Sequence, residues 1–248
     1  MEMTRRTDVG RVRDHNEDST GILQTNSGTV IAIVADGMGG HLAGDVASRL
    51  AVDTIEQTLR LEHVDGTTKD RGDLLIYAVR KANEKVYHLG QEKTQCQGMG
   101  TTAVVVIADE DEVVIAHVGD SRAYMLHNDG LYQLTEDHSF VNVLLRHGQI
   151  TPEEARNHPQ RNMIVRAVGT SEEVEIDVID TPWKQGDLLL LCSDGLTTEV
   201  EERDIGLILS STTMTLDEKA DELIKRALEA GGKDNISLIL LKHTGRSA

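Results

Sequence analysis

Val30-Ile31-Ala32-Ile33-Val34-Ala35-Asp36-Gly37 is an apolar run that stops at an acidic residue followed by glycine. A second run, Leu188-Leu189-Leu190-Leu191-Cys192-Ser193-Asp194-Gly195, stops in the same way. A continuous apolar run of this length, bounded by turn-forming residues, is typical of a strand that is buried on both faces. The sequence therefore predicts two buried strands, each of which delivers a carboxylate to its end.

Three other acidic segments stand in similarly tight contexts. They are Asn16-Glu17-Asp18, Gly119-Asp120-Ser121-Arg122 and Lys233-Asp234-Asn235. Carboxylates that converge from distant parts of a chain repel one another unless cations hold them together. Hard oxygen ligands are those that Mg²⁺ and Mn²⁺ prefer. If these acids converge, we expect a magnesium or manganese site.

The composition indicates one folded domain with an acidic surface. Apolar residues make up 39% of the 248 residues, and the formal net charge is −17. This charge disfavours nucleic acid and anionic membranes as partners. No apolar run approaches the ~20 residues of a membrane-spanning helix, so we expect no membrane insertion. The only cysteines are Cys96 and Cys192, which disfavours a disulfide framework and favours a cytoplasmic protein.

Strand-like and helical segments occur in groups along the chain. Periodicity and caps predict helices over 42–61, from a cap at Asp73 to Gly90, and after capping boxes that begin at Thr151 and Thr215. Because the strands come in consecutive runs, we expect an α+β fold with antiparallel sheets flanked by helices. The predicted strands lie at about 19–25, 28–35, 101–108, 112–118, 121–127, 174–179, 187–193 and 235–241.

An Asp-Gly pair after a strand is most often a hairpin turn, and the segment 128–130 is interpreted in that way. The pair at Asp36 is different, because the chain continues into a predicted helix with no returning strand. The residues that follow the pair at Asp194 do not alternate as a partner strand would. We therefore favour the ligand interpretation at both sites. For Asp120, which lies between two predicted strands, a turn and a ligand explain the pattern equally well.

The remaining acids also have ordinary explanations. A solvated charged loop accounts for Glu17 and Asp18, although Arg13 nearby offers a planar group suited to a phosphate. A local Asx turn accounts for Asp234. Several catalytic schemes are excluded, because the sequence has no Cys-x5-Arg phosphate loop, no G-x-S-x-G elbow, no Walker A loop and no paired histidine spacing for zinc.

Seven short motifs follow one another along the chain: Arg13-x-x-Asn16-Glu17-Asp18, Asp36-Gly37-Met38-Gly39-Gly40-His41, Gly98-Met99-Gly100-Thr101-Thr102, Gly119-Asp120-Ser121-Arg122, Asp137-His138-Ser139, Ser193-Asp194-Gly195 and Asp234-Asn235. In this order they resemble the bacterial protein phosphatase 2C family. The resemblance covers about residues 1–242 and implies one catalytic domain there, followed by a polar tail at 243–248. It implies a four-layer αββα sandwich and a metal-dependent protein serine/threonine phosphatase with two, or three, Mn²⁺ or Mg²⁺ ions.

The resemblance also implies roles for individual residues. Asp36 bridges two metals, the Gly37 carbonyl binds one of them, and Asp194 and Asp234 bind the other. Arg13 holds the substrate phosphate. A hydroxide that bridges the metals then attacks phosphorus in line, and no phosphoenzyme forms.

Further residues complete the implied site. Glu17 and Asp18 act at the second metal through bound water, and Asp120 matches a ligand of a third metal. One departure concerns the proton donor for the leaving alkoxide, because Met38 stands where many eukaryotic members have histidine. The donor stays open between His41 and metal-bound water, and we prefer the water.

The segment 137–169 resembles the flap beside the family's active site. It is interpreted either as a substrate-recognition element or as a packed helical insertion, with equal weight. Similar small bacterial proteins act opposite a membrane-bound Ser/Thr kinase, which implies that kinase and its targets as substrates, and we expect a monomer. The alternatives are an inactive phosphoprotein-binding scaffold of the same fold, which the filled acidic positions disfavour, and a nuclease, which the net charge disfavours.

Overall fold

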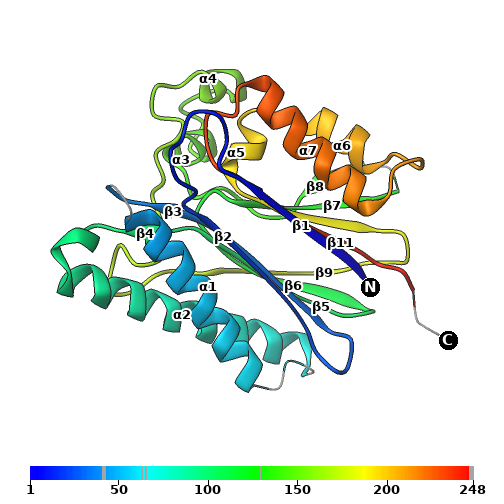
Figure 1. Cartoon of the computed structure of the whole chain (residues 1–248), viewed down its shortest axis with the longest axis horizontal. Helices are drawn as coiled ribbons and strands as arrows, with labels where there is room; N and C mark the ends of the chain where they lie inside the picture. Colours follow the sequence, from blue (N-terminus) through cyan, green and yellow to red (C-terminus); the bar gives the residue numbers. More distant parts are fainter. Residues whose placement is uncertain (41–42, 63, 65, 129, 246–248) are drawn as a thin grey trace.

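Two antiparallel sheets pack face to face between two groups of helices (Figure 1). The computed structural model describes residues 1–40, 43–62, 64, 66–128 and 130–245. The first sheet has the strand order β1 (Glu2–Asp8), β11 (Ile236–Lys242), β10 (Leu188–Cys192), β7 (Arg122–His127) and β8 (Gly130–Gln133). The second has the order β2 (Asp18–Gln24), β3 (Val30–Met38), β5 (Ala103–Ala108), β6 (Glu112–Val118) and β9 (Asp177–Pro182), and the short β4 (Gly100–Thr101) also pairs with β3.

Helices cover the outer face of each sheet (Figure 1). The second sheet is covered by α1 (Ala43–Leu61) and α2 (Thr68–Glu92), which the 3₁₀ turn η1 (Thr94–Cys96) follows. The first sheet is covered by α5 (Asp194–Thr197), α6 (Glu202–Leu209) and α7 (Leu216–Ala230), while α3 (Phe140–Arg146) and α4 (Pro152–Arg156) lie together beyond one end of the sheets. The expected α+β fold and its four-layer αββα sandwich are confirmed. No helix of the described residues is long and apolar enough to span a membrane.

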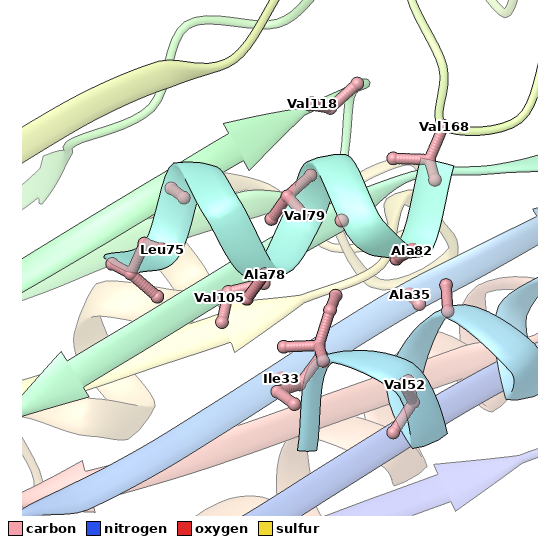
Figure 2. Close-up of a cluster of buried hydrophobic side chains, with 14 of the residues drawn as sticks. Ile33, Ala35, Val52, Leu75, Ala78, Val79, Ala82, Val105, Val118 and Val168 are labelled. Atoms are coloured by element: carbon pink, nitrogen blue, oxygen red, sulfur yellow. The ribbon is translucent and has the colours of Figure 1, made fainter. Parts of the chain in front are cut away.

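The central strand β3 explains why the run quoted at the start is apolar at every position. Ile33 and Ala35 point toward α1 and α2, where they join a cluster that includes Val52 and Val79 (Figure 2). Val34 points the other way, into the apolar layer between the two sheets. A strand that is covered on both faces needs apolar residues at successive positions instead of alternate ones.

The boundaries of α2 differ from those that the sequence pattern predicts. Thr67 caps the helix, since its hydroxyl accepts from Asp70 N at 3.3 Å and its own N–H donates to the Asp70 carboxylate at 3.0 Å. The predicted cap at Asp73 is therefore wrong. The predicted end at Gly90 is wrong as well, because this glycine lies inside the helix, where a Cβ would come within 3.3 Å of the Cys96 carbonyl oxygen.

Three strands also differ from the prediction. β1 was not expected, because its residues are largely polar and it has no apolar face of its own. β9 begins at Asp177 instead of 174. β3 continues two residues beyond Asp36, because Gly37 and Met38 pair with β4, so Asp36 lies within the strand and not at its end. The predicted residues 42 and 129 lie outside the described part of the chain.

The segment after β11 was expected to be a polar tail, and the boundary at 242 stays a prediction. His243 is 7% exposed, with its ring 5.0 Å from that of Trp183. Its Nε2 donates to the Glu110 carbonyl at 2.7 Å. This histidine is therefore packed against the body of the sandwich.

Candidate functional site

The first pair of acidic residues is brought together by the register of β2 and β3. Asp18 lies directly opposite Asp36 in this antiparallel pair. Beyond the pair, Gly37 N donates to the Glu17 carbonyl at 3.1 Å. Glu17, Asp18, Asp36 and Gly37 therefore occupy one corner of the second sheet, although about twenty residues separate the two segments.

The corresponding end of the first sheet reaches across the sandwich through Ser193. This residue follows β10 and donates from Oγ to Asp18 Oδ2 at 2.8 Å. The same Oγ accepts from Ser237 N of β11 at 2.9 Å. Asp194 is the next residue and begins α5, so the carboxylates of the two apolar runs approach each other from opposite sheets.

Asn235, directly before β11, ties together the loop that carries the N-terminal acids. Its Oδ1 accepts from Glu17 N at 2.8 Å, and its Nδ2 donates to the carbonyls of Val9 and His15, both at 2.9 Å. A Cβ at Gly195 would overlap the Asn235 carbonyl oxygen. Only glycine therefore allows α5 to start this close to Asn235.

Arg13 and Asp234 form an ion pair at the mouth of the site. Arg13 Nη2 lies 2.7 Å from Asp234 Oδ2, and the two side chains are 50% and 36% exposed. An ion pair of this exposure contributes little to stability, because solvent screens it. The guanidinium group is therefore held loosely, beside the carboxylates and within reach of solvent.

Desolvation, with added repulsion between neighbouring carboxylates, dominates the interior of this acidic cluster. Desolvation, together with Asp18 and Asp194, raises the pKa of Asp36 well above its ordinary value. Desolvation raises the pKa of Asp18 to about 7, and the hydrogen bond from Ser193 only partly offsets this. Desolvation and Asp234 raise the pKa of Asp194 to about 6. At neutral pH the protein alone does not stabilise all of these charges.

Asp120 joins the cluster from the turn between β6 and β7. Desolvation and the neighbouring Asp194 raise its pKa to about 8. The turn is fixed next to β3, because Thr102 Oγ1 lies 2.7 Å from Ser121 Oγ and also accepts from Asp36 N at 2.9 Å. The structure therefore brings Asp120 to the same end of the sandwich as the other four acidic segments.

Two buried oxygens in the cluster have no partner among the described residues. They are Oδ1 of Asp18 and Oδ1 of Asp120, whose residues are 8% and 7% exposed. A buried carboxylate oxygen without a donor is costly unless a cation or water meets it. No three His, Cys, Asp or Glu side chains of the described residues form a closed cation cage. The residues therefore suit hard divalent cations because they offer carboxylate oxygens whose negative charge has no partner in the described chain. Within that part of the chain they do not form a preformed cage.

Comparison with known proteins identifies the family. A family model described as protein phosphatase 2C matches residues 10–236. The chain belongs to the protein phosphatase 2C family. This phosphatase is 45% identical over 237 residues to the serine/threonine phosphatase stp of Listeria innocua, which covers 96% of this chain and 94% of the relative.

Solved structures agree with this membership. The crystal structure of the serine/threonine phosphatase Stp1 from Staphylococcus aureus has a TM-score of 0.92 and 40% identity, with 97% of this chain and 94% of that chain covered. The catalytic domain of the phosphatase PstP, in complex with two manganese ions, has a TM-score of 0.83 and 35% identity, with 96% of each chain covered. A relative of this phosphatase 2C chain thus holds two manganese ions on the same fold.

Some residues that organise the site were not singled out from the sequence. Ser193 was noted only as part of the motif that contains Asp194, and nothing local indicates that its hydroxyl reaches Asp18, 175 residues away. Thr102 was likewise noted only within its motif. His41, the open candidate for the proton donor, lies outside the described residues.

The flap of this phosphatase joins the turn that carries Asp120 through its first residues. His138 N donates to the Gly119 carbonyl at 2.7 Å, and His138 Nδ1 accepts from Gly119 N at 3.0 Å. Arg122 binds both oxygens of Asp137, at 2.8 and 2.7 Å. The segment 137–169 is therefore anchored beside the acidic cluster. This position is compatible with a substrate-recognition element and with a packed helical insertion.

Proposed function

We propose that two divalent cations, Mn²⁺ or Mg²⁺, bind the acidic cluster of this protein serine/threonine phosphatase and serve the hydrolysis of phosphoserine and phosphothreonine. The observation that carries the proposal is the convergence of Asp18, Asp36, Asp120 and Asp194 without an internal cation. Desolvation, and after it repulsion from neighbouring carboxylates, raises the pKa of each of these groups, and two of their oxygens lack a donor. Metal cations would relieve both costs together.

The strands and loops that carry these acids support a role for each as a ligand. Asp36 lies centrally, between Asp18 on β2 and Asp194 from the opposing sheet, and is therefore suited to bridge two ions. The Gly37 carbonyl would bind one of these ions, and Asp194 and Asp234 would bind the other. When bound, the ions would lower the pKa of a water molecule for attack on phosphorus and offset charge on the phosphoryl oxygens.

The other acids support this arrangement from its two sides. Glu17 and Asp18 would hold water molecules of the second ion. Asp120, with its unpartnered Oδ1, would provide with Asp194 a third site. The main chain of Glu17 is fixed by Asn235 and Gly37, so its side chain starts from a constrained position.

Arg13 would bind the substrate phosphate. Its guanidinium group lies beside the cluster and is half exposed, so a phosphate can reach it from solvent. Guanidinium and phosphate groups match in geometry and form paired, charge-assisted hydrogen bonds. Asp234 holds the group in place until the phosphate takes its hydrogen bonds. Met38 has no proton to give, so we propose water as the donor to the leaving alkoxide.

The similarity to small bacterial phosphatases supports a choice of physiological substrates. We propose phosphorylated proteins, among them the Ser/Thr kinase that this phosphatase opposes. We also propose a location in the cytoplasm, which the buried and unpaired Cys96 and Cys192 support. We further propose that the protein is a monomer.

The direct test measures phosphate release from a phosphothreonine peptide by metal-stripped protein, with Mn²⁺ added back over a concentration series. We expect no release without metal and a saturable increase with Mn²⁺. The Asp36→Asn variant should bind Mn²⁺ more weakly in calorimetry as well as lose activity. Undiminished release in the presence of excess chelator would contradict the proposal. Peptide binding without release, from folded protein at saturating Mn²⁺, would favour the scaffold.

A further inference from the structure

A large cavity opens beside the acidic cluster. It has a volume of about 980 Å³, and Asp120 and Asp194 line part of it. One wall comes from the flap with α3 and α4, and the other from α5 and the start of α6. The volume is at the upper end of the range for small-molecule sites. It therefore has room for more than the phosphorylated side chain.

Three of the six acidic residues described in the cavity walls already have protein partners. Asp137 is bound in a bidentate pair by Arg122. Glu202 Oε1 accepts from Tyr124 Oη at 3.1 Å and lies 3.5 Å from Arg122 Nη1. Glu136 accepts from an asparagine amide at 3.1 Å and lies 3.4 Å from an arginine outside the cavity. These carboxylates do not repel an incoming anion with their full charge.

The arginines of the walls are in the opposite state. Arg156 of α4, Arg161 of the flap and Arg203 of α6 line the cavity and are exposed. Within the described part of the chain, none of their guanidinium groups has an ion-pair or hydrogen-bond partner. Among the described wall carboxylates, Glu201, Asp120 and Asp194 likewise have no ion-pair partner, and the last two belong to the acidic cluster of the proposed metal site. When the proposed cations neutralise Asp120 and Asp194, these walls offer three available guanidinium groups against the single free carboxylate of Glu201.

We infer that this cavity binds the polypeptide next to the phosphorylated residue, and that Arg156, Arg161 and Arg203 recognise a second anionic group on that polypeptide. The inference rests on the proposed function and names the substrate class: phosphopeptides that carry another phosphate or a carboxylate near the scissile phosphate. Guanidinium groups bind both anions through paired hydrogen bonds, and the doubly charged phosphate more strongly. The arginines on opposite walls approach such a group from two sides.

The test compares phosphothreonine peptides in which one residue near the phosphothreonine is varied. At that position the peptides carry phosphoserine, glutamate or glutamine, and positions are tested one at a time. For wild-type protein with Mn²⁺ we expect kcat/KM to fall in that order, by about fivefold to tenfold from first to last, mainly through KM. The order separates phosphate from carboxylate recognition. Hydrolysis of p-nitrophenyl phosphate, which has no neighbouring residues, reports on the reaction itself.

Two variants and one control connect the preference to the arginines. Arg156→Ala and Arg203→Ala, singly and together, should remove the preference and leave p-nitrophenyl phosphate hydrolysis unchanged. Arg226→Ala, which removes an exposed arginine that is paired on α7, should retain the preference. Equal kcat/KM for all peptides, or a preference that survives the double substitution, would overturn the inference while the phosphatase reaction stands. If the protein hydrolysed none of these substrates, both the proposed function and this inference would be overturned.

Discussion

Two acidic regions lie at opposite ends of the second sheet, and they differ in whether the protein supplies its own cation. At one end Arg71, which is 5% exposed, binds Asp109 at 2.5 Å and Glu112 at 3.1 Å. Although desolvation acts to raise it, the hydrogen bond from Arg71 lowers the pKa of Asp109 below its ordinary value. At the other end the carboxylates around Asp36 have raised pKa values, Arg13 pairs with Asp234 at their margin, and Arg122 is bound to Asp137.

The difference separates structural from functional acids. Carboxylates that are partly buried against their own arginine are satisfied in the folded chain. Those buried without one make the folded chain incomplete until something outside it supplies positive charge. The contrast could not be read from the sequence, in which both regions are short acidic segments next to apolar strands.

The largest effect should come from Asp36→Asn, with Asp109→Asn as its matched control. Removing the charge of Asp36 takes away the central ligand of the proposed metal site, so we expect kcat/KM for a phosphothreonine peptide to fall by about 10²- to 10³-fold. The control changes an acid that is already paired, and should leave kcat/KM within about twofold while lowering stability. Comparable activity losses in the two variants would remove the distinction between the two regions.

The next effect concerns stability at the other end. Arg71→Leu leaves two partly buried carboxylates without a cation, and we expect the free energy of unfolding to fall by about 3 kcal/mol. The lower part of the usual range applies, since Asp109 and Glu112 are about a quarter exposed. Arg49→Leu, which breaks an exposed ion pair on α1, should cost under about 1 kcal/mol in the same urea titration. A cost as small for Arg71 would mean that its ion pairs are not structural.

Added Mn²⁺ should stabilise the protein through the acidic cluster around Asp36 and not through the region around Arg71. Mn²⁺ at about 100 times its Kd adds about 2.7 kcal/mol per site, or about 5–10 °C in Tm for a domain of this size. In Asp36→Asn most of this shift should disappear, whereas Arg71→Leu should show the full shift from its lower starting Tm. A shift of equal size in wild type and Asp36→Asn, measured by differential scanning fluorimetry, would place the bound metal elsewhere.

The last prediction concerns the effect of pH on the stability of the metal-free protein. Asp18, Asp120 and Asp194 have folded-state pKa values of about 7, 8 and 6, above their unfolded values. The folded state therefore binds more protons, and stability should fall as pH rises from about 4 to about 8. Each such carboxyl contributes at most about 1.4 kcal/mol per pH unit. Saturating Mn²⁺ should flatten this slope, and a slope that persists with Mn²⁺ would point to other groups.

The sequence was sufficient for the fold class because the apolar strands are covered on both faces and carry a strong signal. It failed at β1, since this strand lies at the edge of its sheet, beside β11, and Thr4, at 8% exposure, is its one buried residue. It also failed at the start of α2, where Asp70 occupies the capping-box position and makes the capping bonds itself.

For the candidate site, the acids were predictable and their supports were not. An acid after an apolar strand is a local pattern. The hydrogen bonds that position it join residues far apart: Ser193 with Asp18, and Asn235 with Glu17, separated by 175 and 218 positions. Such contacts depend on how the two sheets are stacked, which no short window contains.

The place of β11 has a consequence for synthesis on the ribosome. This strand lies between β1 and β10 and pairs with both, and Asn235 at its start holds the Glu17 segment. A growing chain that ends before Ile236 has its two neighbouring strands but nothing to join them, and it should release no phosphate from a peptide when stalled there. We therefore expect an incomplete chain on the ribosome to have no phosphatase activity until β11 has been synthesised and has paired with β1 and β10.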